Sequence, residues 1–393
     1  MKKRAAKPAL MSCSVIDPVA LTQALVKCRS VTPVDDGALQ VAIDALTPLG
    51  FKIERLRFSE DGYAPVDNVF ARLGEAGPHL CYLGHTDVVP PGDEKEWQFP
   101  PFSATLDDGK IYGRGTADMK GCNAAFISAI ARYLNDQPLR GSISLLLTGD
   151  EEAHAINGTV KVIEWMQKNN QMPDVALVGE PSNATALGET MRIGRRGSLS
   201  GTIRVRGIQG HSAYPERADN PVPRLVRLVY ALMHTHFDSG SEFFPPTNLV
   251  ISSIDVGNPA PNVIPSKAKA IFNIRFNDKW TPDSLTAKIN SVLQSTGEPY
   301  ELDLLPCNAT SFVTKPGDWV SLVAGAVEKI SGTAPKLDTG GGTSDARFIA
   351  PFCPTVEYGL LNATIHKTDE HISVSDLEAL TQTYHEILKK YFA

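Results

Sequence analysis

The chain contains the run Leu80-Cys81-Tyr82-Leu83-Gly84-His85-Thr86-Asp87, in which small and apolar residues lead directly to polar ones. Short apolar runs of this kind are typical of the buried strands of a parallel sheet. In open α/β sheets, ligands bind outside the carboxyl ends of the strands. The pattern therefore predicts a central strand that carries His85 and Asp87 to a binding edge.

Polar residues follow further apolar or glycine-rich runs, and they include Asp118, Glu151, Glu152, Glu180 and His366. Taken singly, an aspartate before a helix is usually a cap, and a Glu-Glu pair is usually a solvated turn. Their recurrence at successive expected strand ends instead favours one shared site. Two histidines with several carboxylates suit Zn²⁺ or a similar metal, so the pattern predicts metal-assisted hydrolysis.

The overall composition excludes several classes of protein. The chain has 393 residues, of which 42% are hydrophobic and 21% charged, as in ordinary globular proteins of two or three domains. The net charge is -6, and no basic cluster of a nucleic-acid-binding protein is present. No apolar run approaches the ~18 residues of a membrane span. We expect a small-molecule substrate, and neither nucleic acid nor membrane as a partner.

The cysteines and the N-terminus bear on the cellular compartment. The six cysteines are scattered without a Cys-x-x-Cys pair, which favours free thiols in a reducing compartment. The basic start 1–7 is not followed by the long apolar segment of a usual signal peptide. We therefore expect a cytoplasmic protein in which residues 1–11 form a disordered extension.

The periodicity of the chain predicts an α/β fold with an insertion. Expected helices and strands alternate up to about residue 195, which indicates crossover connections: helices at 18–28, 38–46 and 119–134, and strands at 51–58, 69–73, 79–83, 143–147 and 175–178. Near residue 196 the pattern changes to alternating strands at 196–206, 248–255 and 268–277, with helices at 222–233 and 281–295. The first pattern returns later, with helices at 319–331 and 376–391 and a strand at 356–359. We expect a discontinuous catalytic domain, 12–195 and 312–393, and an inserted α+β domain, 196–311.

Four motifs give the chain a family resemblance. The segments 85–90, 113–121, 149–152 and 179–181 are similar to motifs of the M20 family of co-catalytic zinc amidohydrolases and peptidases, and the resemblance extends from about residue 14 to the end. It implies a zinc-peptidase-like domain with a mixed, mostly parallel sheet, and two Zn²⁺ per subunit, for which Co²⁺ could substitute. The implied roles are a bridging ligand, Asp118, the ligands of one zinc, His85 and Glu180, and those of the other, Glu152 and His366. Glu151 would then be the general base, and Asp87 would orient His85.

Further stretches narrow the resemblance: 195–201, 210–215, 218–221, 340–345 and 362–367 are similar to the branch of the family that hydrolyses N-succinyl-LL-2,6-diaminopimelate. This implies a homodimer formed through the inserted domain, with His211 reaching the partner's active site to stabilise an oxyanion. Because guanidinium matches carboxylate bidentately, Arg195 and Arg275 are candidates for binding the substrate carboxylates. Positions similar to substrate-contacting residues of the family are Tyr214, Asn262, Thr343 and Asn362.

Two other classes of function remain open. One is a different member of the same family, such as an acetylornithine deacetylase, an aminoacylase or a dipeptidase, since the metal ligands are shared. The other is a binding or structural protein that keeps the fold without the reaction. Glu151 argues against a binding protein, because a protein that only binds has no need of a base.

Overall fold

The computed structural model describes residues 15–307 and 309–393, which form two compact units. The first unit runs to Gly194 and includes Thr314–Asp338 and Ser344–Ala393. The second unit comprises Arg195–Val313 and Thr339–Thr343. The extension expected at residues 1–11 lies outside the described residues. The short segment 339–343 belongs to the second unit, whereas the sequence placed it with the first.

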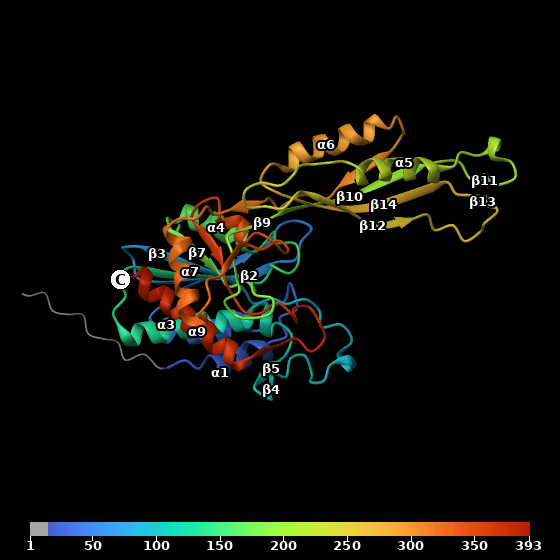
Figure 1. The fold of residues 1–393 in the computed structure, drawn as a ribbon. Helices are drawn as coiled ribbons and strands as arrows, with labels where there is room; N and C mark the ends of the chain where they lie inside the picture. The colour runs from blue at the N-terminus through green and yellow to red at the C-terminus, as the bar shows by residue number, and fades with distance from the viewer. Residues whose placement is uncertain (1–14, 308) are drawn as a thin grey trace, which may run out of the picture. The chain divides into compact units, whose positions relative to one another are not determined.

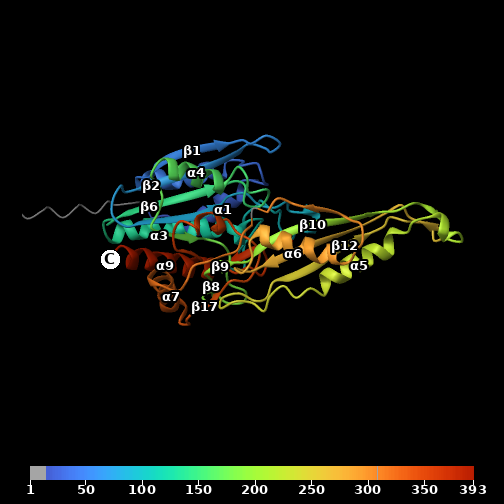
Figure 2. The same ribbon diagram turned by 90° about the horizontal axis from the view of Figure 1, so that it is seen from above.

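An eight-stranded mixed sheet forms the centre of the first unit (Figures 1 and 2). Its order is β1 (Lys52–Phe58), β2 (Val66–Leu73), β6 (Ser142–Thr148), β3 (His79–His85), β7 (Val175–Val178), β18 (Thr355–Glu357), β8 (Thr190–Arg192) and β17 (Lys336–Asp338). The central strand β3 is buried throughout and pairs in parallel with both β6 and β7. The α/β fold with a mixed, mostly parallel sheet is therefore confirmed.

Helices cover both faces of this sheet, with α4 on one side and α3 and α9 on the other (Figure 1). At the start of α1 the side chain of Asp17 accepts from the N–H of Val19 at 3.0 Å, and Pro18 occupies the first turn. The helices of the unit are α1 (Pro18–Lys27), α2 (Ala38–Leu46), α3 (Gly121–Asp136), α4 (Thr159–Lys168), α7 (Asp318–Ser331), α8 (Ala346–Ile349) and α9 (Val374–Tyr391), with 3₁₀ turns η1 (Thr47–Leu49) and η2 (Glu94–Glu96).

The segment before α3 differs from its prediction. The expected helix at 119–134 begins only at Gly121, after the irregular turn η3 (Thr116–Lys120). Asp118 has φ -121° and ψ 94°, so it lies in a turn and not at the end of a strand. Gly113 and Gly115, with φ of 155° and 85°, allow the chain to leave the strand direction here. The short strands beside this turn were not predicted either: β4 (Thr105–Asp107), β5 (Lys110–Tyr112) and β19 (His371–Ser373).

The second unit is a four-stranded antiparallel sheet with two helices over one face (Figure 1). The buried face of the sheet carries Phe272, Ile274 and Phe276, and the helices pack on it. The sheet order is β12 (Asn248–Asp255), β14 (Lys267–Phe276), β10 (Gly197–Arg206) and β15 (Glu301–Leu304); the helices are α5 (Pro221–Met233) and α6 (Pro282–Ser295). The remaining elements are β9 (Gly194–Arg195), β11 (Gly210–His211), η4 (Pro215–Arg217), β13 (Val263–Ile264) and β16 (Phe312–Val313). None of the helices in the described ranges has both the length and the apolar character needed to cross a bilayer.

His79, the first residue of β3, makes the stability of the fold depend on pH. Its Nε2 lies 2.8 Å from Ser144 Oγ, and burial lowers the pKa of its imidazole from 6.5 to about 4. The folded state therefore keeps His79 neutral, whereas the unfolded chain takes up a proton as the pH falls below 6.5. This stabilising contribution is present above pH 6.5 and is lost as the pH falls towards 4.

We expect His79→Gln to unfold with a weaker pH dependence than the parent protein. Between pH 7.5 and 5, the parent should lose about 2 kcal/mol of unfolding free energy that the variant does not lose. Urea denaturation at the two pH values measures this difference. The matched control is His236→Gln, because His236 is exposed. Equal losses in all three proteins would contradict a neutral buried His79.

Candidate metal centre

His85 ends β3 and is buried among acceptor oxygens. Its Nδ1 lies 2.9 Å from the backbone oxygen of Asp87, and its Nε2 lies 3.1 Å from Asp118 Oδ1 and 3.7 Å from Glu180 Oε1. A carbonyl oxygen only accepts, so Nδ1 carries the hydrogen of a neutral ring. The lone pair of Nε2 then faces the two carboxylates, which is the tautomer that a metal ligand needs.

Asp118 divides its carboxylate between two histidines. One oxygen lies 3.1 Å from His85 Nε2, and the other lies 3.3 Å from His366 Nε2. His366 Nε2 is also 3.0 Å from Glu152 Oε1. The turn η3 therefore places one carboxylate between two groups of donor side chains that come from distant segments of the chain.

Two sets of three donors meet at this carboxylate. His85, Asp118 and Glu180 form one set, and Asp118, Glu152 and His366 form the other; the donor atoms within each set lie within 4.8 Å of one another. Imidazole nitrogens with carboxylate oxygens are a common ligand set for zinc. Two cations held close together need a shared anionic ligand, and Asp118 has the position of one. The donor sets therefore fit a two-metal site.

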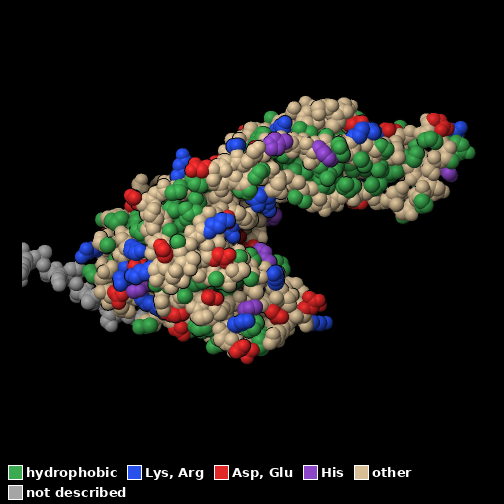
Figure 3. Space-filling model, in the orientation of Figure 1, with side chains coloured by type: hydrophobic (Ala, Val, Ile, Leu, Met, Phe, Trp, Pro, Cys, Tyr) green, Lys and Arg blue, Asp and Glu red, His purple; other side chains and the backbone are tan. Residues whose placement is uncertain are grey.

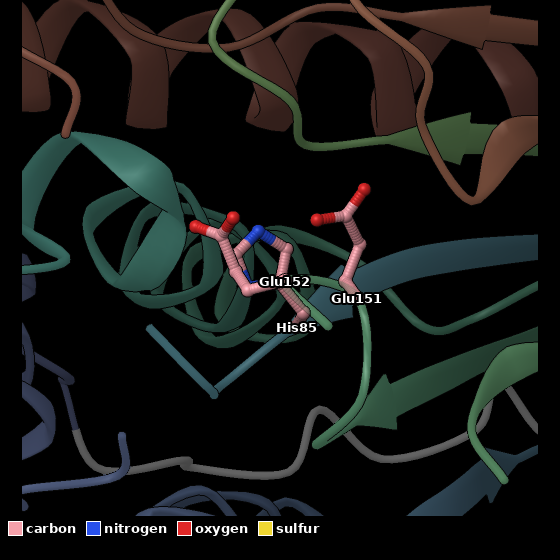
Figure 4. A group of neighbouring side chains, drawn as sticks. All are labelled: His85, Glu151 and Glu152. Atoms are coloured by element: carbon pink, nitrogen blue, oxygen red, sulfur yellow. The ribbon is translucent and has the colours of Figure 1, made fainter. Parts of the chain in front are cut away.

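Glu151 and Glu152 follow β6 and lie beside the imidazole of His85 (Figure 4). Their backbone N–H groups donate to the two carboxylate oxygens of Asp87, at 3.3 and 3.1 Å. The side chain of Asp87 was expected to orient His85, but its nearer oxygen is 3.6 Å from Nδ1. The side chain of Asp87 instead anchors the turn after β6, and its backbone oxygen accepts from the imidazole of His85.

Two acids of the site, Glu151 and Asp87, have raised pKa values. Burial, and then the negative charge of Glu180, raise the pKa of Glu151 well above its ordinary value. Burial raises the pKa of Asp87 to about 6. A carboxyl group with a raised pKa in a cluster of ligands is typical of a proton-transferring site.

The two histidines respond to the carboxylates around them. Burial alone would lower the pKa of His85, but the hydrogen bond and charge of Asp118 raise it well above its ordinary value. Hydrogen bonds with Asp118 and Glu152 raise the pKa of His366 to about 10. The cluster thus favours positive charge at both histidines, and a divalent cation would supply that charge at the same points.

Three of the predicted site residues, His211, Tyr214 and Asn262, lie together beside the two-stranded sheet of β11 and β13 in the second unit. His211 in β11 pairs with Val263 in β13, and the N–H of Ser212 donates to the backbone oxygen of Asn262 at 2.9 Å. The rings of His211 and Tyr214 are 5.7 Å apart. The N–H of Ala213 donates to His211 Nδ1 at 3.0 Å, so a neutral ring carries its hydrogen on Nε2 and can donate it.

The remaining predicted substrate residues are divided between the units. In the second unit, Arg195 is buried, and its Nη1 donates to the backbone oxygen of Gly342 at 3.2 Å, beside Thr343. Arg275 on β14 is half-buried, and burial, followed by the positive charge of Arg196, lowers its pKa. Asn362 belongs to the first unit.

The structure also shows contacts of the site that no sequence pattern revealed. Asn123 in α3 donates its Nδ2 to the backbone oxygen of His85 at 2.7 Å and accepts from Tyr82 Oη at 3.0 Å. Arg114 and Glu370 form a buried ion pair beside Asp118. Arg114 lies within a motif quoted above, but nothing in the sequence connects it with Glu370.

The chain is similar to known proteins over nearly its whole length. A curated succinyl-diaminopimelate desuccinylase of Rhodopseudomonas palustris (strain BisB18) is 50% identical over 392 residues, which cover 98% of this chain and 100% of that protein. One of Rhodospirillum centenum is 51% identical over 378 residues, covering 96% and 98%. Among solved structures, an M20 family metallo-carboxypeptidase of Sulfolobus solfataricus matches with a TM-score of 0.80 at 19% identity, covering 95% of this chain and 99% of that one.

A second solved structure shares the fold with a lower TM-score. It is a dinuclear metal-binding peptidase of the M20 family from Bacillus subtilis, with a TM-score of 0.64 at 15% identity, covering 95% of this chain and 99% of that one. The family described as peptidase family M20/M25/M40 matches residues 81–390. The matched region contains every residue of both donor sets, and the chain belongs to peptidase family M20/M25/M40.

Proposed function

We propose that the protein is a two-metal amide hydrolase that cleaves N-succinyl-LL-2,6-diaminopimelate to succinate and LL-2,6-diaminopimelate. The observation that carries the proposal is the carboxylate of Asp118, which lies between His85 and His366 at 3.1 and 3.3 Å. The choice of substrate rests on the names of relatives about half identical over nearly the whole chain.

The two donor sets assign the proposed metal ligands. His85, Asp118 and Glu180 would hold one Zn²⁺, and Asp118, Glu152 and His366 the other, with Co²⁺ able to take the same nitrogen and oxygen ligands. Zinc at such a site acts as a Lewis acid, which polarises an amide carbonyl and makes water more acidic. His85, Asp118 and Glu180 are buried, and these surroundings strengthen the electrostatic effects at the first set.

Glu151 is the proposed general base. It would take a proton from the attacking water and pass it to the departing amine, and its raised pKa suits both steps. The carboxylate of Asp87 holds the backbone N–H groups of Glu151 and Glu152, so the base and a ligand are fixed by one anchor. Asp87 thus has a positioning role in the proposed mechanism.

Substrate binding is assigned mainly to the second unit. The substrate carries three carboxylates, and Arg195 and Arg275 supply guanidinium groups for them. His211, whose neutral ring carries its hydrogen on Nε2, would donate to the oxyanion. The other proposed contacts are Tyr214, Asn262, Thr343 and Asn362.

The second unit is also the proposed dimerisation domain. Hydrophobic side chains gather over α5, where Val226, Tyr230 and Met233 are exposed (Figure 3). Exposed apolar patches of this kind mark association surfaces. We propose a homodimer formed through this unit, with His211 completing the active site of the partner.

Hydrolysis of N-succinyl-LL-2,6-diaminopimelate by the zinc-loaded protein tests the proposed substrate, with N-acetylornithine assayed in parallel. We expect kcat/KM to favour the succinyl substrate by at least ~10²-fold, because groups built to bind its carboxylates would be left unpaired by the other substrate. Equal turnover of both, or turnover of acetylornithine alone, would assign the protein to another activity of the same family.

Glu151→Gln tests the general base. The variant should lose ~10²- to 10⁴-fold in kcat, because the amide cannot take a proton, and should still bind two metals. Steady-state kinetics and metal analysis of the same sample measure the two effects. The matched control is Glu164→Gln on the exposed side of α4. Loss of a metal from Glu151→Gln would make Glu151 a ligand and leave the base unassigned.

Mixing two inactive variants tests the dimer and the role of His211 together. His211→Ala should bind both metals but turn over slowly, and Glu151→Gln lacks the base. In a mixed dimer, the Glu151→Gln subunit would supply its His211 to the active site of the other subunit, which has an intact Glu151. Refolding the variants together should restore about a quarter of the parent activity, since half of the dimers are mixed and each has one complete site. Activity no higher than in the separate variants would contradict exchange of His211 between subunits.

A further inference from the structure

Arg114 and Glu370 form an ion pair that is almost completely buried in the first unit. Their exposed fractions are 2% and 0%, and Arg114 Nη1 lies 2.6 Å from Glu370 Oε2. The guanidinium also lies over the ring of Trp97, at 5.2 Å from its centroid. Neither residue belongs to the donor sets of the metal centre.

Glu370 fixes the backbone of the bridging carboxylate. Its Oε1 accepts from the N–H of Ala117 at 3.0 Å and from the N–H of Asp118 at 3.2 Å. Its own backbone oxygen accepts from the N–H of Gly113 at 2.8 Å. Because η3 lacks regular helical geometry at Asp118, these bonds determine where the turn lies.

Arg114 fixes the segment that carries His366. Its terminal nitrogens donate to the backbone oxygens of Lys367 at 3.2 Å and of His366 at 3.4 Å, and to Pro90 O at 3.4 Å. His366 has φ 61°, a left-handed conformation that costs a residue other than glycine energy. Such a conformation persists where neighbouring contacts determine it, and Arg114 supplies two of them.

The cost of burying this pair argues that it has a positional role. A buried ion pair loses the hydration of both charges, and apolar residues of the same size often give equal or greater stability. What apolar residues cannot supply is directed hydrogen bonds to backbone groups of three segments. Two of these segments carry Asp118 and His366, and the third, at Pro90, follows His85 in the chain.

We propose that Arg114 and Glu370 are positioning residues, which hold Asp118 and His366 at the separation that the second metal requires. The inference rests on the proposed ligand set of that metal, Asp118, Glu152 and His366. Glu370 acts on Asp118 through its backbone N–H, and Arg114 acts on His366 through its backbone oxygen. Neither side chain supplies a donor atom to either set.

Two conservative variants and a matched ion pair test the proposal. Glu370→Gln keeps an acceptor for the N–H groups but removes the charge that Arg114 binds, and Arg114→Lys keeps the charge but loses the planar fork. The controls are Glu378→Gln and Arg132→Lys, because Arg132 and Glu378 form a two-fold hydrogen-bonded pair, at 2.7 Å each, between α3 and α9. Circular dichroism verifies folding, and titration of the metal-free protein with Co²⁺, followed by its visible absorption, measures both metal affinities.

We expect Glu370→Gln and Arg114→Lys to bind the second Co²⁺ ~10- to 100-fold more weakly than the parent, as is typical for partners of metal ligands. The first Co²⁺ should lose less affinity than the second, because His85 and Glu180 keep their places and only the shared ligand Asp118 is disturbed. The two control variants should bind both ions as the parent does, whatever their melting temperatures.

Parent affinity for the second Co²⁺ in both variants would overturn the proposal, as would an equal weakening in the Arg132 and Glu378 controls. His366→Ala separates this outcome from a failure of the ligand set. If His366→Ala loses the second ion while Glu370→Gln and Arg114→Lys keep it, the ligands stand and only the positioning role fails. If His366→Ala binds both ions normally, the ligand set fails, and the positioning role fails with it.

Discussion

The crowding of carboxylates around His85 is the constraint that governs the first unit. Carboxylate oxygens of four residues lie within 4.8 Å of a ring nitrogen of His85. These residues are Asp118, Glu180, Glu151 and Glu152. Like charges in a buried region repel strongly, because little water screens them. A fold can keep such groups together only if positive charge balances them, and the donor sets are suited to cations that supply this charge. The backbone around the site is anchored as well: Asp87 accepts from the N–H groups of Glu151 and Glu152, and Glu370 accepts from that of Asp118.

The bracing of the site comes largely from backbone groups at the ends of regular elements. The backbone oxygen of His85 accepts from Asn123 in the buried helix α3, and its imidazole is fixed by the backbone oxygen of Asp87. The turn after β6 is tied to the side chain of Asp87 by two N–H groups. His85 is therefore held from the buried strand β3 and the buried helix α3, whereas Asp118 and His366 lie in turns that contact Glu370 and Arg114. This is the arrangement that keeps reacting groups within the small tolerances of catalysis.

Local patterns predicted the parts of the fold that depend on local physics. The buried strands β3 and β7 and the Asp17 cap were visible as apolar runs and as an Asp-Pro pair. The position of Asp118 was not, because the glycines at 113 and 115 signal a break in the strand but not the direction of the turn. The Arg114–Glu370 pair joins positions 256 residues apart, and only the assembled fold brings them together. The residues of the two donor sets could be picked out from the sequence, because histidine and carboxylates recur at expected strand ends, and the structure brings them together.

The proposed metal ligands do not select a substrate by themselves, because polarising a carbonyl and making water more acidic serve the hydrolysis of many amides. To select one substrate, a site needs groups that bind this substrate well and that are left in an unfavourable state when it is absent. Arg275 and Arg196 in the second unit would have this character towards the proposed substrate. The positive charge of Arg196 lowers the pKa of Arg275, and within the described ranges neither guanidinium has a carboxylate partner. Two neighbouring cations repel each other, and a bound carboxylate relieves that repulsion while it gains bidentate hydrogen bonds. A substrate with several carboxylates gains from both effects, whereas a neutral acyl group gains from neither.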